Sequence, residues 1–171
     1  MSSPKFMAIV DTREQLPLDL RWRDGQFLMT KRGTLKTADY SVEGLEDKIA
    51  IERKSLQDLI GCIGKGRERF ERCLDRMRSF DVRAVVVEGS WSMIERRQYV
   101  GMVHPNAVVG SILGWVASGI PFLLVDSRER ASEYVARLLV FGHKRYGGDV
   151  AKPGGPDAEL PDDDVHCVSG L

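Results

Sequence analysis

The sequence predicts an α/β fold in which a mixed central β-sheet is flanked by helices. Two short apolar runs, residues 82–89 and 121–126, have the composition of buried strands in a parallel sheet. Apolar residues at helical spacing indicate an amphipathic helix over residues 67–80. Its apolar stripe consists of Phe70, Cys73, Leu74 and Met77. The dipeptide Asp24-Gly25 is typical of a β-hairpin turn, so the sheet should also contain antiparallel pairs.

The first third of the chain is expected to form strands. Residues 6–10 are an apolar run that ends at Asp11, which is the pattern of a buried strand with a polar side chain at its C-terminal end. Residues 18–53 should form an antiparallel meander, and the later strands of this meander carry Asp39 and Glu52.

Capping residues indicate where the helices begin. Ser55 has the properties of an N-cap for a helix over residues 56–63. Several glycines then separate this helix from the next one. Pro105 should open a helix that continues to about residue 118, and Ser127 should cap the last helix.

The composition suits one domain at residues 1–146, followed by a tail at residues 147–171. The tail is acidic and rich in Gly and Pro, so it cannot form a core and is expected to be disordered. Residues 149–171 hold six acidic residues and one basic residue. The first 148 residues therefore hold 24 basic and 19 acidic residues, a net charge of +5, which suits contact with phosphate groups.

No stretch of the sequence is long and apolar enough to span a membrane, and the N-terminus lacks the apolar run of a secretory signal. The three cysteines have no metal-binding spacing, which favours reduced thiols. We therefore expect an intracellular protein of the cytoplasm and nucleoid, or of a nucleus, without a membrane partner.

Three charged residues carry the chemistry that the sequence suggests. Glu52 and Lys54 are two residues apart on one predicted strand, so their side chains project to the same face, while Arg53 projects to the other. Asp39 lies thirteen residues before Glu52 in another strand-like run. Two carboxylates can hold a divalent cation, and a lysine can orient or deprotonate the attacking water of a metal-dependent nuclease. The Glu-x-Lys triplet alone is weak evidence, because any exposed strand can carry one.

Four segments together resemble the nuclease domain of the XPF/Mus family of structure-specific endonucleases. They are residues 10–14 (VDTRE), 38–40 (ADY), 51–60 (IERKSLQDLI) and 64–71 (GKGRERFE). The family pattern is roughly D-x-R-E, G-D, E-R-K-x-x-x-D, and G-R followed by an amphipathic helix. The one departure is Ala38, which stands where the family usually has Gly. The resemblance implies a restriction-endonuclease-like nuclease core of the PD-(D/E)XK type.

The resemblance also implies roles for individual residues. Asp39 and Glu52 would bind Mg²⁺ or Mn²⁺ directly, with Asp11 as a third acidic contributor, either directly or through water. Lys54 would position the attacking water. Arginines would brace the carboxylates or the DNA backbone through bidentate hydrogen bonds. These arginines are Arg13, Arg53 and Arg67.

Several of these residues also have plainer interpretations. In the family pattern Asp58 lies beside the lysine and would orient Lys54 or Arg53, but it could equally stabilise a helix start. Asp11 and Arg13 could form a surface ion pair in a turn. Arg67 follows a glycine at a helix start, and we expect it to point back toward the catalytic strand and contact a phosphate or a carboxylate.

The predicted function is a Mg²⁺- or Mn²⁺-dependent endonuclease that cuts branched DNA, such as a 3′ flap or a fork. Two alternatives stay open: a non-catalytic DNA-binding or scaffolding subunit of a heterodimer, and a restriction- or recombination-type nuclease with the same metal site. The sequence lacks the tandem helix-hairpin-helix module of the family, so a recruiting protein is a possible partner. Large apolar residues near the C-terminal helices either belong to the core or form a homodimer or heterodimer interface. They are Trp115, Phe141 and Tyr146.

Overall fold

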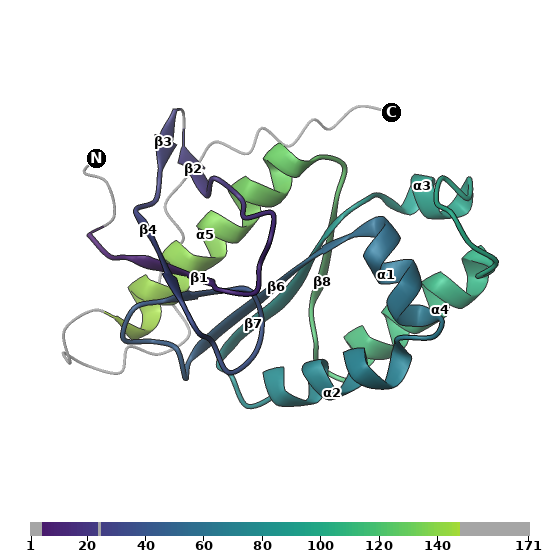
Figure 1. Cartoon of the computed structure of the whole chain (residues 1–171), viewed down its shortest axis with the longest axis horizontal. Coiled ribbons are helices and arrows are strands. Elements are labelled where there is room, and N and C mark those ends of the chain that lie inside the picture. Colours follow the sequence, from purple (N-terminus) through teal and green to yellow (C-terminus); the bar gives the residue numbers. More distant parts are fainter. Residues whose placement is uncertain (1–4, 24, 148–171) are drawn as a thin grey trace, which may run out of the picture.

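A mixed six-stranded sheet forms the centre of the protein, as the sequence predicts (Figure 1). The structure is a computed structural model that describes residues 5–23 and 25–147. The strand order is β4-β1-β5-β6-β7-β8, and β2 and β3 form a separate two-stranded sheet. The strands are β1 (Ala8–Asp11), β2 (Arg21–Arg23), β3 (Gln26–Phe27), β4 (Thr30–Gly33), β5 (Tyr40–Val42), β6 (Ile49–Ser55), β7 (Val82–Glu88) and β8 (Phe122–Val125).

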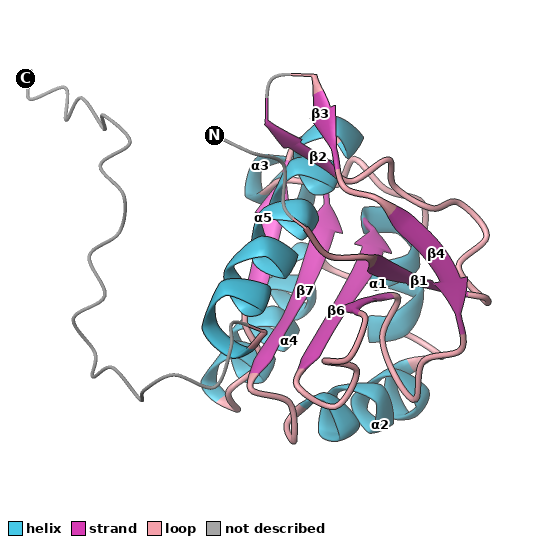
Figure 2. Cartoon of the chain, turned by 90° about the vertical axis from the view of Figure 1, so that its left-hand side faces the viewer, coloured by secondary structure: helices cyan, strands magenta, loops and turns pink. Residues whose placement is uncertain are grey.

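Both kinds of strand pairing occur in the sheet. Strands β6, β7 and β8 are parallel, and the β6–β7 ladder runs from the pair Ile49–Val82 to the pair Ser55–Glu88. Strand β5 is antiparallel to both β1 and β6. The prediction of an antiparallel meander over residues 18–53 is wrong, because β4 pairs in parallel with β1. The short strands β2 and β3 project beyond the sheet as a hairpin (Figure 2), and Gly25 in their turn has φ +70°.

Five helices are found among the described residues, and they cover the two faces of the sheet (Figures 1 and 2). Helix α5 packs on one face, and α1, α2 and α4 pack on the other. The helices are α1 (Leu56–Ile63), α2 (Arg67–Met77), α3 (Trp91–Glu95), α4 (Pro105–Ala117) and α5 (Arg128–Tyr146). The predicted caps are confirmed, since the side chains of Ser55 and Ser127 accept hydrogen bonds from backbone N–H groups of the first turns of α1 and α5.

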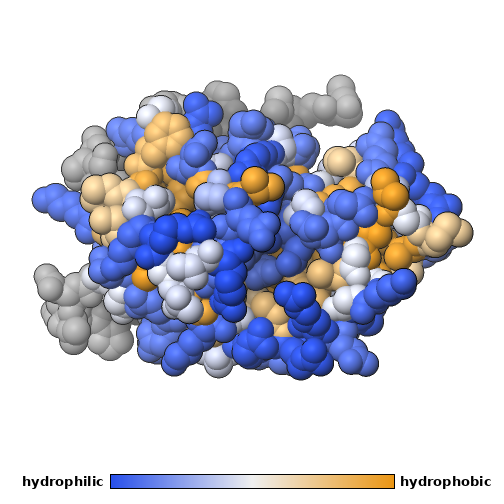
Figure 3. All heavy atoms as spheres, in the orientation of Figure 1, coloured by the Kyte–Doolittle hydropathy of each residue, from blue (hydrophilic) through white to orange (hydrophobic). Residues whose placement is uncertain are grey.

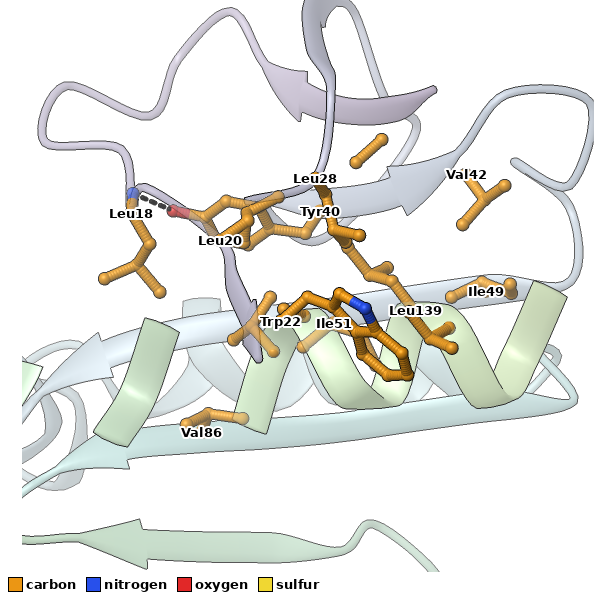
Figure 4. Packing of buried hydrophobic residues seen from close by; sticks show 14 of the residues in the cluster. Leu18, Leu20, Trp22, Leu28, Tyr40, Val42, Ile49, Ile51, Val86 and Leu139 are labelled. Atoms are coloured by element: carbon orange, nitrogen blue, oxygen red, sulfur yellow. Dashed lines mark hydrogen bonds between the residues drawn. The ribbon is translucent and has the colours of Figure 1, made fainter. Parts of the chain in front are cut away.

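The core on the α5 side of the sheet is continuous from the strands to the hairpin (Figure 4). Tyr40 of β5 is fully buried, and its hydroxyl accepts a hydrogen bond of 2.9 Å from the N–H of Leu18. A buried tyrosine needs such a partner for its hydroxyl. This bond attaches the segment after β1 to the strand that follows Asp39.

The second core lies between the sheet and helices α1, α2 and α4. Trp115 of α4 is buried there, and its ring stacks on Phe122 and meets Phe70 edge-on. Of the two alternatives for Trp115, the structure therefore supports the core, because its ring fills the space between α2, α4 and β8.

Two helix predictions also need correction. The helix expected over residues 67–80 ends at Met77, and Phe80 reaches the core from the turn that follows. Helix α3, capped by Ser90, was not predicted from the sequence. It has only five residues, too few to produce a periodic pattern. The tail expected at residues 147–171 lies outside the described residues beyond Gly147.

Candidate active site

Strand β6 brings a buried carboxylate and an ammonium together, as the alternation of its side chains predicts. Oε1 of Glu52 lies 2.7 Å from Nζ of Lys54, and the Lys54 ammonium also lies 5.2 Å above the ring of Phe70. Burial acts to lower the pKa of Lys54, but the charge of Glu52 and the hydrogen bond to it outweigh burial, so this pKa lies above its ordinary value. Lys54 therefore stays protonated at neutral pH.

Asp39 lies against the same strand from the residue before β5. Its Oδ2 accepts a hydrogen bond of 2.8 Å from the N–H of Arg53, and its own N–H donates to the carbonyl of Ile51. Burial and the nearby charge of Glu52 raise the pKa of Asp39 to about 7. The charge of Lys54 acts on Asp39 as well, so residues 39, 52 and 54 form one electrostatically linked group.

Ala38 has φ +64°, a left-handed conformation that favours glycine. This is the position where the family pattern usually has Gly. The turn before Asp39 therefore keeps the geometry of a glycine turn although the residue is alanine.

Asp11, at the end of β1, has different partners from those expected. Its two carboxylate oxygens accept hydrogen bonds from the side chain and N–H of Arg13 and from the N–H of Leu35, at 2.7–3.1 Å. Burial acts to raise the pKa of Asp11, but these hydrogen bonds outweigh it and hold the pKa below its ordinary value. Among residues 5–23 and 25–147, no three acidic, histidine or cysteine side chains are arranged to hold a metal ion. The predicted convergence of three carboxylates is thus not found, because the carboxylate of Asp11 is hydrogen-bonded to Arg13 and Leu35 instead.

Arg53 and Asp58 lie near this group but face other partners. The side chain of Arg53 projects to the opposite face of β6, as predicted, where its Nε lies 2.6 Å from Oε1 of Glu88. Asp58 is exposed, its N–H donates to Oγ of Ser55, and its carboxylate accepts from the same hydroxyl. The structure thus gives Asp58 the helix-end role and shows no contact between it and Lys54 or Arg53.

The side chain of Arg67 contacts its own helix α2 and the neighbouring helix α4. Its guanidinium pairs with Glu71 at 2.9 Å, donates to the hydroxyl of Ser111 and lies 5.4 Å above the ring of Trp115. These contacts hold α2 against α4. The expected carboxylate contact exists, but it is made to Glu71 one turn further along the same helix.

Glu14 and Cys73 belong to the site although the sequence did not single them out. Glu14 is buried, and its charge adds to the rise in the pKa of Asp39. Sγ of Cys73 lies 3.9 Å from Oε2 of Glu52 and 3.4 Å from Oγ1 of Thr37. Glu14 lies within the segment VDTRE, which was a signal for it, whereas Cys73 could be assigned only to an apolar helix stripe.

Exposed apolar side chains gather at the end of the molecule that carries α3 and α4 (Figure 3). The most exposed are Val100 and Met102, in the segment that joins the two helices. Phe141 on α5 is 47% exposed, while Tyr146 is half-buried against the α5-side core. None of the helices among the described residues could cross a membrane.

Comparisons with known proteins place this geometry in a family. Two solved structures share the fold, both of XPF from Aeropyrum pernix. The first has a TM-score of 0.64 and 18% identity, with 91% of this chain and 70% of that chain covered. The second, a complex with DNA, has a TM-score of 0.62 and 19% identity over 85% of this chain and 69% of that chain. A search of curated protein sequences gives no match. The sequence matches the ERCC4 domain over residues 10–138, and the protein belongs to the ERCC4 domain family.

Proposed function

We propose that this protein is a metal-dependent DNA endonuclease that hydrolyses phosphodiester bonds in branched DNA, such as a 3′ flap or a fork. The observation that carries the proposal is the pair of Glu52 and Lys54, 2.7 Å apart, with the carboxylate of Asp39 electrostatically linked to both. Membership of the ERCC4 domain family and the XPF fold support it. The solved XPF complex with DNA supports DNA as the substrate.

Asp39 and Glu52 would hold Mg²⁺ or Mn²⁺. Carboxylate oxygens are the ligands that these hard cations prefer. The pKa of Asp39 is raised because its negative charge is buried and lies near that of Glu52. A bound cation would offset this repulsion. When bound, such an ion would polarise the scissile phosphate and lower the pKa of its own water. Glu14 supplies further negative charge nearby.

Lys54 would stabilise charge rather than accept a proton. Its raised pKa keeps the ammonium charged, so it can hold the attacking water in place and offset the negative charge that grows on the phosphate oxygens. The side chain of Arg13 is 66% exposed, so its guanidinium could also donate to a phosphate of the DNA backbone. Arg53 holds Asp39 through its backbone N–H.

We also propose that the chain pairs with a second copy or a related subunit through its C-terminal helices. Phe141 on α5 and Leu113 and Val116 on α4 are exposed large apolar side chains, which a partner would cover. A recruiting protein would add DNA affinity to that of this domain. The proposed location is intracellular, in the cytoplasm and nucleoid or in a nucleus, where DNA is available.

Cleavage assays test the function. Labelled flap, fork, Holliday-junction and plain duplex DNA are incubated with Mg²⁺, Mn²⁺ or EDTA, using the wild-type chain and the variants Lys54→Ala and Asp39→Ala. Lys48→Ala is the matched control, because Lys48 forms its ion pair with Asp81 on the surface, at 3.2 Å.

The outcomes separate the proposal from its rivals. Metal-dependent cutting of branched DNA that both site variants lose and the control keeps supports the proposal. Binding without cutting on every substrate indicates a scaffolding subunit. Preferred cutting of plain duplex indicates a restriction- or recombination-type enzyme.

A further inference from the structure

The segment that carries Arg13 and Glu14 is held in place by arginines from distant parts of the chain. Nη2 of Arg32, on β4, donates to the carbonyls of Thr12 and Glu14 at 3.2 and 2.7 Å. Nη2 of Arg128, the first residue of α5, donates to the carbonyls of Leu16 and Pro17 at 2.9 and 2.8 Å. These bonds satisfy backbone acceptors of a segment that has no strand or helix to pair them.

Arg128 has a second partner that leads to the catalytic strand. Its Nη1 lies 3.4 Å from Oε1 of Glu88, and the same oxygen lies 2.6 Å from Nε of Arg53. The side chains of Arg53 and Glu88 are only 10% and 16% exposed, so solvent screens this pair weakly. A carboxylate between two guanidiniums, with little water around it, fixes the positions of both.

Two routes connect Arg128 to the carboxylate of Asp39. The first runs through Glu88 and the side chain of Arg53, whose backbone N–H holds Oδ2 of Asp39 at 2.8 Å. The second runs through Leu16, whose N–H donates to Oε1 of Glu14 at 2.8 Å while its carbonyl accepts from Arg128. The charge of Glu14 in turn acts on Asp39.

We propose that Arg128 is a positioning residue of the catalytic centre. It holds Glu14 and Arg53 in position next to Asp39. Arg128 itself lies on α5 and acts on residues 39, 52 and 54 only through these intermediate groups. This inference rests on the proposed nuclease function. It deepens that function by assigning a role to a side chain on the α5 face of the sheet, away from the Glu52–Lys54 pair.

A direct contact between Arg128 and DNA is the natural rival. The side chain of Arg128 is 41% exposed and lines a cavity of about 300 Å³ together with Arg21, Phe27 and Ser132. A side chain that grips substrate chiefly affects KM, whereas one that positions catalytic groups chiefly affects kcat. The two roles therefore predict different kinetics.

The test compares Arg128→Met and Arg128→Lys with the wild-type chain and with Arg130→Met. Arg130 is the matched control, because it lies two residues further along α5 and its guanidinium pairs with the exposed Asp126, at 3.7 Å. We measure kcat and KM on the preferred DNA substrate, and separately the rise in melting temperature that Mg²⁺ causes without DNA. Circular dichroism confirms that each variant is folded.

We expect Arg128→Met to lower kcat by about 10- to 100-fold with KM changed less than about threefold, as small displacements of catalytic groups do. Arg128→Lys should recover only part of this loss, because an ammonium cannot match a guanidinium that serves two carbonyls and a carboxylate. The rise in melting temperature caused by Mg²⁺ should shrink in Arg128→Met and persist in Arg130→Met.

Two results overturn the inference while leaving the nuclease proposal intact. They are an unchanged kcat in a folded Arg128→Met variant, and a raised KM with normal kcat, which would make Arg128 a DNA contact. A wild-type chain that neither cuts DNA nor responds to Mg²⁺ would instead overturn the nuclease function itself, and this inference with it.

Discussion

Replacing Asp39 with Asn is expected to stabilise the folded protein at about pH 8 and to change little at about pH 4. In the folded chain, burial and the charge of Glu52 raise the pKa of Asp39 from 3.8 to about 7. The folded state therefore binds this proton more tightly than the unfolded chain does, and the free energy of unfolding falls as the pH rises through that window. An amide carries no such penalty and can still accept the hydrogen bond from the N–H of Arg53.

The size of the effect follows from the two pKa values. One pKa unit corresponds to ~1.4 kcal/mol, so the difference between 3.8 and about 7 sets an upper bound of roughly 4 kcal/mol. Part of the Asp39 surface stays in contact with water, which reduces the penalty. We therefore expect Asp39→Asn to raise the free energy of unfolding by about 2 kcal/mol at about pH 8.

Urea unfolding at a series of pH values measures this difference directly. Asp126→Asn is the control, because the carboxylate of Asp126 is 73% exposed and its removal should give a small difference at every pH. Adding Mg²⁺ at about pH 8 should stabilise the wild-type chain more than Asp39→Asn, since the cation offsets the repulsion between the carboxylates of Asp39 and Glu52. A variant that is less stable than wild type at about pH 8, or a difference that does not vary with pH, would refute the electrostatic account of the site.

Three further predictions concern the catalytic lysine, the core and the turn before Asp39. Lys54→Met should lower kcat by about 10²- to 10³-fold with DNA affinity nearly unchanged in a binding assay, and near-normal cleavage would contradict its proposed role. Leu74→Ala should lower the free energy of unfolding by about 2–5 kcal/mol, because Leu74 is buried between α2 and the sheet. Leu16→Ala should cost less than about 1 kcal/mol, because the side chain of Leu16 is exposed, and equal losses in urea titrations would refute this assignment of the core. Ala38→Gly should change stability by less than about 1 kcal/mol, since relief of the left-handed strain at φ +64° offsets the lost methyl group. The same change at Ala136, in the middle of α5, should cost about 2 kcal/mol in thermal or urea unfolding, and a larger loss at Ala38 than at Ala136 would show that the turn is not strained.

Local patterns in the sequence were sufficient to locate most elements of the fold. Helix α1 occupies the predicted residues and has the predicted cap at Ser55, because capping chemistry involves only neighbouring residues. Strands β7 and β8 follow from short apolar runs, although β8 lies at the sheet edge and is mostly half-buried. The pairing of β4 with β1 could not be predicted, because the residues of β4 are mostly exposed and leave no pattern that identifies a neighbour.

The contacts of the candidate site were likewise predictable only in part. The contact between Glu52 and Lys54 was predictable, because side chains two residues apart on a strand share a face whatever the rest of the chain does. The position of Asp58 at a helix start was predictable as one of two alternatives, and the structure selected the local one. The contacts of Arg67 with α4 were not predictable, because Ser111 and Trp115 lie more than forty residues away in the chain.

By itself, the sequence determined what short-range geometry and burial can determine: the order of the strands and helices along the chain, most of their caps, and the shared face of Glu52 and Lys54. Tertiary structure alone decided that Asp39 lies against the N–H of Arg53, that Arg13 and Leu35 occupy the carboxylate of Asp11, and that Arg128 reaches Glu88. The physical reason is that periodicity and capping depend on neighbours within about one helical turn. Strand partners and buried ion pairs instead depend on the packing of segments that are far apart in the chain.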